Sequence, residues 1–96
     1  MSFRKMAANA VEADDGTRIE VRTGHSVTYL KAGRALELGR EIVVLPSGAT
    51  GGSVILLKGA QSWSDGSPLT DTDRAEVRRD LEIAAKLLGT KYRFEE

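Results

Sequence analysis

The chain has no cysteine, one histidine and two prolines among its 96 residues. Without cysteine there is no disulfide, thiolate nucleophile or zinc–thiolate site, and this composition suits a reducing cytoplasm. His25 would need an orienting acid or a nucleophile to act as a general base, and several further ligands to hold a metal. The sequence supplies no such constellation. We therefore expect no catalytic residue, no metal and no cofactor, and we predict that the protein is not an enzyme.

A surplus of either charge is also missing, because 14 basic side chains balance 14 acidic ones. Such a chain lacks the broad basic surface by which many nucleic-acid-binding proteins attract phosphates. The longest apolar runs, residues 42–46 and 54–57, are far shorter than the roughly 20 residues that span a bilayer. No apolar segment follows the basic residues near the N-terminus, as it does in a signal peptide. We expect a cytoplasmic protein without membrane association, for which nucleic acid is a disfavoured partner.

The first 16 residues differ in pattern from those that follow. Residues 6–13 suit one or two turns of helix, and Asp15-Gly16 makes a strong break. We therefore expect residues 1–16 to form an N-terminal arm that frays easily. Residues 17–96 are expected to form a single domain, because a chain of this length supports only one hydrophobic core.

Alternating apolar and polar residues between positions 17 and 58 predict a series of strands. Ile19 and Val21 alternate with charged residues, and residues 26–30 continue this period of two. Gly33 can adopt the positive φ of a tight hairpin turn. The segments expected after it are a return strand at 35–38, a connection at 39–40, a more apolar and hence more central strand at 41–45, a long loop at 46–52 and a strand at 53–57.

One long amphipathic helix is predicted between Thr70 and Gly89. Thr70 suits the N-cap, with Asp73 as its capping-box partner, and Gly89 suits the C-terminal stop. The apolar stripe consists of Val77, Leu81, Ala84, Ala85 and Leu88. Tyr92 and Phe94 then alternate with charged residues, which predicts a closing strand that returns to the sheet. The predicted fold is α+β: a small, mainly antiparallel sheet of five or six strands, packed by one C-terminal helix.

Trp63 is the single tryptophan and precedes the turn at residues 64–68, which leads into the helix. A large aromatic side chain at this joint is expected to be a structural anchor that holds the helix on the sheet. If a pocket lay beneath it, a ligand carrier or a minor enzyme would become the better interpretation.

Two surface features are candidates for binding a partner. Ile83 and Leu87 lie one helical turn apart and off the apolar stripe. They are either covered by the N-terminal arm or exposed as a patch for a protein partner or a second copy of the chain. The glycine-rich loop, with Gly48, Thr50 and Gly51, leads into a strand and lacks the lysine and the helix of a phosphate-binding loop. It is a hairpin connection and a candidate contact loop.

Charged residues gather around the predicted helix. The acidic residues at its start do not follow the order of an EF-hand, so capping and solvation explain them better. They are Asp65, Asp71, Asp73, Glu76 and Asp80. The basic residues spread over more than a third of the helical wheel, which favours a solvated face over a nucleic-acid site. They are Arg74, Arg78, Arg79 and Lys86, with Lys91 and Arg93 beyond the helix.

The order of several features resembles a known family. The features are the His-Ser-Val-Thr-Tyr-Leu strand at 25–30, the Gly-Arg hairpin at 33–34, the apolar strand at 53–57, Trp63 before its Asp-Gly-Ser-Pro turn, and Tyr-Arg-Phe at 92–94. Over residues 18–95 this order resembles immunity protein family seventy-four, predicted immunity proteins of bacterial polymorphic-toxin systems, although the loop at 46–52 is longer here. The resemblance implies a non-enzymatic protein that neutralises a cognate toxin by direct binding. The alternative is a small regulatory or nucleic-acid-binding domain that uses the helix arginines.

Overall fold

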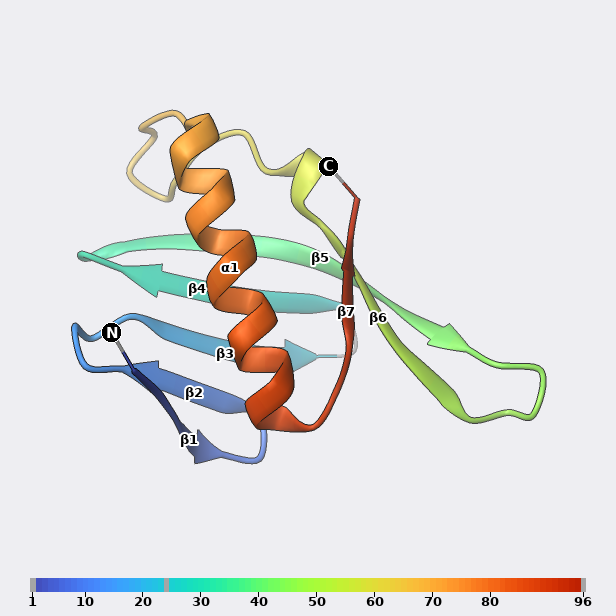
Figure 1. The fold of residues 1–96 in the computed structure, drawn as a ribbon. Coiled ribbons are helices and arrows are strands. Elements are labelled where there is room, and N and C mark those ends of the chain that lie inside the picture. The colour runs from blue at the N-terminus through green and yellow to red at the C-terminus, as the bar shows by residue number, and fades with distance from the viewer. Residues whose placement is uncertain (1, 24, 96) are drawn as a thin grey trace.

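The computed structural model describes residues 2–23 and 25–95, and Figure 1 shows one sheet crossed by one long helix. The strands are β1 (Phe3–Ala7), β2 (Ala10–Ala13), β3 (Arg18–Thr23), β4 (Ser26–Lys31), β5 (Arg34–Val44), β6 (Thr50–Leu56) and β7 (Tyr92–Phe94). They lie in the sheet in chain order, and each neighbouring pair is antiparallel except β6 and β7, which are parallel. The predicted α+β fold is confirmed, with seven strands rather than five or six.

The N-terminal residues form the first hairpin of the sheet. The helical turns predicted within residues 6–13 were wrong, and so was the separate arm at residues 1–16, because β1 and β2 are ladder strands. β2 pairs with β3, with Val11 opposite Ile19, and Val11 is fully buried. These two segments form strands because they pair with a neighbouring strand, since their own sequence has little strand propensity.

The turn between β4 and β5 is the predicted one, with Ala32 and Gly33 both at positive φ. The connection predicted at residues 39–40 was wrong, because β5 continues through it. Gly39 pairs with Ser26 on one side and with Leu56 on the other. A Cβ at position 39 would lie 3.1 Å from a methyl group of Leu56, so glycine permits this close approach.

The second half of β5 and the first half of β6 extend beyond the rest of the sheet as a two-stranded hairpin (Figure 1). We call residues 41–52 the projecting hairpin. The strand predicted at residues 41–45 was expected to be central, and this was wrong. Ile42 and Val44 are 45% and 66% exposed, because the helix does not cover this part of the sheet. The predicted loop at 46–52 is shorter than expected, since β6 already begins at Thr50.

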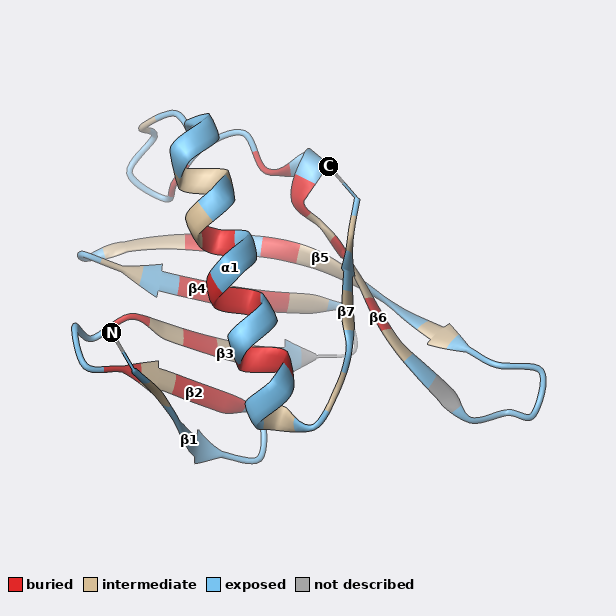
Figure 2. Ribbon diagram, in the orientation of Figure 1, coloured by how far each residue is buried: buried red, intermediate tan, exposed pale blue. Residues whose placement is uncertain are grey.

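The helix α1 (Asp71–Leu88) begins and ends where the sequence predicts. Thr70 and Asp73 form a reciprocal capping box, and Gly89 adopts the left-handed conformation at the C-terminal end. Its inner face is buried at Val77, Leu81, Ala84 and Ala85, as predicted. Figure 2 shows buried positions on the underside of α1 and on the strands beneath it, so the core is one layer between helix and sheet. Among the described residues, no helix has both the length and the apolar character needed to cross a membrane.

Candidate functional site

Trp63 anchors the start of α1 on the sheet, as predicted. It is 4% exposed, and its ring centroid lies 6.0 Å from that of Tyr29 on β4. The indole Nε1 donates to Asp73 Oδ2 at 3.2 Å, and the Arg34 guanidinium lies 4.3 Å from the ring centroid. The pKa of Asp73 is held below its usual value, because the Thr70 backbone N–H and the indole N–H both donate to its carboxylate.

A hollow of about 610 Å³ lies beside this anchor. Its lining includes the opposite charges of Arg22 and Glu37 and the hydroxyl groups of Ser62 and Ser64. Trp63 also borders it but offers almost no free surface. Small-molecule sites are lined mainly by apolar and aromatic surface, so this polar hollow has little of the character that a ligand carrier requires.

A buried polar contact joins the middle of α1 to the sheet, and the sequence interpretation missed it. The solvated position expected for Asp80 was wrong, because this residue is fully buried. Tyr29 Oη donates to Asp80 Oδ2 at 2.6 Å, and both residues are fully buried. Burial raises the pKa of the Tyr29 hydroxyl, and the bond to Asp80 adds to this shift. Asp80 lies on the helix stripe beside Val77 and Leu81, and this spacing was the available signal. Because both partners are fully buried between helix and sheet, we interpret the pair as a structural link.

Two of the helix arginines are engaged within the molecule. The Arg74 guanidinium donates to the carbonyl oxygens of Leu57 and Ala60, which holds the segment between β6 and Trp63. Arg78 lies over the ring of Phe94 and pairs with Glu82 at 3.3 Å. Arg74 therefore has a structural role within the molecule.

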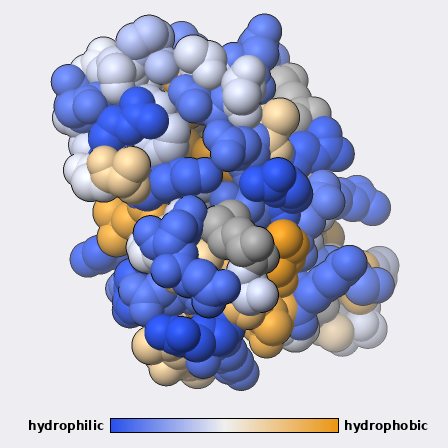
Figure 3. Space-filling model, turned by 60° about the vertical axis from the view of Figure 1, so that its left-hand side comes forward, coloured by the Kyte–Doolittle hydropathy of each residue, from blue (hydrophilic) through white to orange (hydrophobic). Residues whose placement is uncertain are grey.

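The helix positions proposed for partner binding, Ile83 and Leu87, are each 37% exposed. β1 and β2 contact the helix in place of the predicted arm, but they leave both side chains partly open. On the face shown in Figure 3, hydrophobic areas are small and divided by hydrophilic side chains. Both helix residues are less exposed than Ile42, Val44 and Leu45 of the projecting hairpin.

The three loop candidates all belong to the projecting hairpin. Gly48 lies in its exposed turn with a φ of 89°. Thr50 lies in β6 opposite Val44. Gly51 lies beneath Leu45, where an added Cβ would be 3.0 Å from a leucine methyl carbon. The hairpin thus brings these positions together with its exposed apolar side chains, whereas Ile83 and Leu87 lie on the helix.

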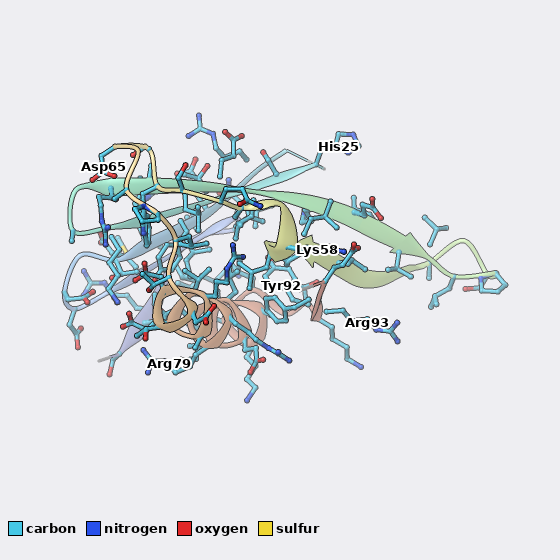
Figure 4. The ribbon with its side chains drawn as sticks, turned by 90° about the horizontal axis from the view of Figure 1, so that it is seen from above. His25, Lys58, Asp65, Arg79, Tyr92 and Arg93 are labelled. Carbon is cyan, nitrogen blue, oxygen red and sulfur yellow. The ribbon has the colours of Figure 1, made fainter. Side chains whose placement is uncertain are left out.

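A groove runs between the projecting hairpin and the C-terminal end of α1. It consists of two adjoining hollows of about 490 and 350 Å³, which share Gly51, Thr90 and Lys91. Val43 and Leu45 form its apolar wall on the hairpin side. In Figure 4, Tyr92 is directed toward the space between helix and sheet, and Arg93 points outward on the hairpin side. Burial raises the pKa of Tyr92.

The backbone of Gly52 fixes one side of this groove. Ser53 N–H donates to Lys91 O at 2.9 Å, which ties β6 to the segment that enters β7. Gly52 has a φ of 97°, and a Cβ there would lie 2.5 Å from the same oxygen. Only glycine fits so close to Lys91, so this residue allows the two segments to meet.

Other sequence candidates are explained without a site. Asp65 accepts bonds from Ser67 within its turn, and Asp73 serves the helix cap. His25 is exposed in the turn before β4. In the part of the chain that the structure describes, no group of three or more acidic, histidine or cysteine side chains could hold a metal ion.

The fold and these surfaces define a small α+β domain with a projecting apolar hairpin and a groove beside it. Comparison with known proteins gives no match to a family model, to a curated protein or to a solved structure. We therefore infer function from these surfaces and from the resemblance in the sequence.

Proposed function

We propose that this chain is a non-enzymatic protein-binding domain, and that its projecting hairpin is the main contact surface. The observation that carries the proposal is the exposure of Ile42, Val44 and Leu45, which are 45%, 66% and 44% exposed on one short hairpin. Grouped exposed apolar side chains on a small domain are typical of protein interaction sites. Burying them would supply the apolar centre that such interfaces have.

The shape of the hairpin supports the same proposal. A two-stranded hairpin that extends beyond its sheet has no helix behind it and is marginally stable alone. Exposed apolar strands are also prone to aggregate, and proteins usually protect them with charge or proline. Glu41 and Pro46 flank the exposed stretch and give some of this protection. The three exposed apolar side chains between them, Ile42, Val44 and Leu45, remain unprotected. A partner that covers them explains why they are apolar.

We further propose that the partner is a bacterial toxin and that binding neutralises it. The support for this step is the resemblance of residues 18–95 to immunity proteins of polymorphic-toxin systems. Such a protein blocks its target by contact and needs a few strong anchor residues in place of catalytic groups. Residues of the hairpin are placed to act as such anchors.

Photo-crosslinking in cells of the natural host tests the proposal. A benzoylphenylalanine at position 44 should capture one major protein, whereas the same group at position 37 should not. Glu37 is a matched control, because it is exposed on the same strand but within the body of the sheet. The captured protein should arrest growth when expressed alone, and co-expression of the wild-type chain should relieve the arrest.

The double variant Ile42→Thr/Val44→Thr completes the test, because it keeps β-branching and removes apolar surface. It should fold normally and fail to protect the cells. If the captured partner is harmless, the toxin assignment is wrong while protein binding stands. If position 44 captures no protein, or the recovered partner is a nucleic acid bound in a salt-sensitive way, the proposal itself is wrong.

A further inference from the structure

We infer that the groove between the projecting hairpin and the C-terminal end of α1 binds an acidic segment of the partner that also carries an apolar residue. The inference rests on the proposed function and specifies the chemistry of the partner. The groove has two unlike walls, one apolar and one basic. Val43 and Leu45 offer apolar surface on the hairpin side. Lys86, Lys91 and Arg93 form the basic wall, from the end of α1 and the segment after it.

The charge balance of the groove is positive. Its one acidic lining residue is Glu82, and this carboxylate is already paired with Arg78 at 3.3 Å. Within residues 2–23 and 25–95, no carboxylate forms an ion pair with Lys86, Lys91 or Arg93. Three cations of a chain with no net charge therefore gather at one groove, and they complement a segment of opposite charge.

The carbonyl end of α1 also faces this region and has the opposite effect. A helix C-terminus carries about half of a negative charge. Two of the last helix carbonyl groups already accept hydrogen bonds, because Thr90 N–H donates to Ala85 O and Gly89 N–H donates to Lys86 O. Three unit charges outweigh that half charge, so the groove attracts carboxylates.

The dimensions of the groove suit an extended segment better than a compact ligand. The two hollows are open to solvent and continuous along Gly51, Thr90 and Lys91. Side chains of a strand point alternately to opposite sides, so one extended segment can place apolar residues on Val43 and Leu45 and carboxylates near the basic wall. At Gly51 the space that a side chain would fill is taken by Leu45, so the apolar wall lies directly on the β6 backbone.

Peptide selection from a random phage-displayed dodecapeptide library tests the inference without a known partner. Selection on the wild-type protein should enrich peptides of net negative charge that contain at least one large apolar residue. Synthetic copies of these peptides should bind the Lys91→Gln/Arg93→Gln variant at least about fivefold more weakly than the wild type. This is the loss expected when exposed charge pairs worth about 1 kcal/mol are removed. They should perturb the amide NMR signals of Gly51 and Lys91.

The matched control is Arg4→Gln/Lys5→Gln, which removes two exposed positive charges from β1, at the other edge of the sheet. It should leave peptide affinity unchanged within about twofold. Both variants alter exposed residues, so each should melt near the wild-type temperature. Lys86 is left in place, because it lies in the last turn of α1 and favours the helix.

The outcomes separate this inference from the proposed function. Enrichment of neutral or basic peptides, no enrichment at all, or equal binding to Lys91→Gln/Arg93→Gln would overturn the acidic-segment inference. Tighter binding of a single-stranded oligonucleotide than of the selected peptides would also overturn it. The hairpin proposal would still stand in each case if position 44 captured its protein. Conversely, acidic peptides could bind the groove while position 44 captures nothing, which would remove the hairpin proposal alone.

Discussion

The two parts of β5 both carry large apolar residues but have opposite environments. In residues 34–40, Leu36 and Leu38 face α1 and are almost fully buried. In residues 41–44, Ile42 and Val44 lie beyond the helix and are largely exposed. One strand thus belongs to the core at its start and to the surface at its end. The apolar residues of a strand therefore do not show by themselves which part of it the helix covers.

This comparison divides the molecule into a body, which is held by the core beneath α1, and a projecting hairpin held by its own ladder. Removing a side chain from the body should lower the free energy of unfolding. Removing one from the projecting hairpin should leave that energy nearly unchanged and should affect binding.

The largest effect is expected for Trp63→Ala. The indole is buried against Tyr29 and donates to Asp73 at the helix cap, so its loss should cost about 3–5 kcal/mol of unfolding free energy. Urea denaturation followed by far-ultraviolet circular dichroism measures it. A cost below about 1 kcal/mol would show that Trp63 is not the joint between helix and sheet.

Leu38→Ala and Val44→Ala test the division within a single strand. Leu38 is 1% exposed, and its truncation should cost about 2–5 kcal/mol. Val44 is 66% exposed, and its truncation should change stability by about 0.5 kcal/mol or less. Denaturant titrations of both variants give the comparison. Equal costs would contradict the distinction between body and hairpin.

Gly52→Ala and Gly48→Ala test the boundary between the two regions. Both glycines have positive φ, which costs about 1 kcal/mol or more for alanine. At position 52 the new Cβ would also meet Lys91 O at 2.5 Å, whereas position 48 is open. We therefore expect Gly52→Ala to cost at least about 1 kcal/mol more than Gly48→Ala in thermal or urea unfolding. A smaller cost at position 52 would contradict the close approach of β6 to Lys91.

The smallest effect is expected on acidification below about pH 4. The folded pKa of Asp73 is lowered, so its contribution to stability is complete above about pH 5 and is lost as pH falls below the unfolded value of about 3.9. The indole N–H signal of Trp63 should shift over this range while the amide signal of Gly48 does not. Asp73→Asn should abolish the shift, and a shift that persists in this variant would contradict the assignment.

The sequence was informative where structure depends on near neighbours. The helix limits follow from Thr70, Asp73 and Gly89, all of which act within one turn of the chain. The turn at Gly33 and the burial of Trp63 were predicted for similar local reasons. The strand β2 was missed because its pairing with β3, and not its own residues, makes it a strand.

The groove could not be predicted because it joins distant segments. Lys91 meets Gly52 and Ser53 only because β7 returns parallel to β6 after the helix. On a helical wheel the basic residues were spread and suggested a solvated face. The exposed apolar strand was mistaken for a central one, because an apolar run does not show whether the helix covers it.

The most direct test of the central claim is the dissociation constant of the partner captured at position 44, measured for wild type and for Ile42→Thr/Val44→Thr. Loss of two apolar anchors should weaken binding by about tenfold or more, while the melting temperature stays within about 2 °C of wild type because both positions are exposed. Unchanged affinity in a normally folded variant would contradict the claim that the projecting hairpin is the contact surface.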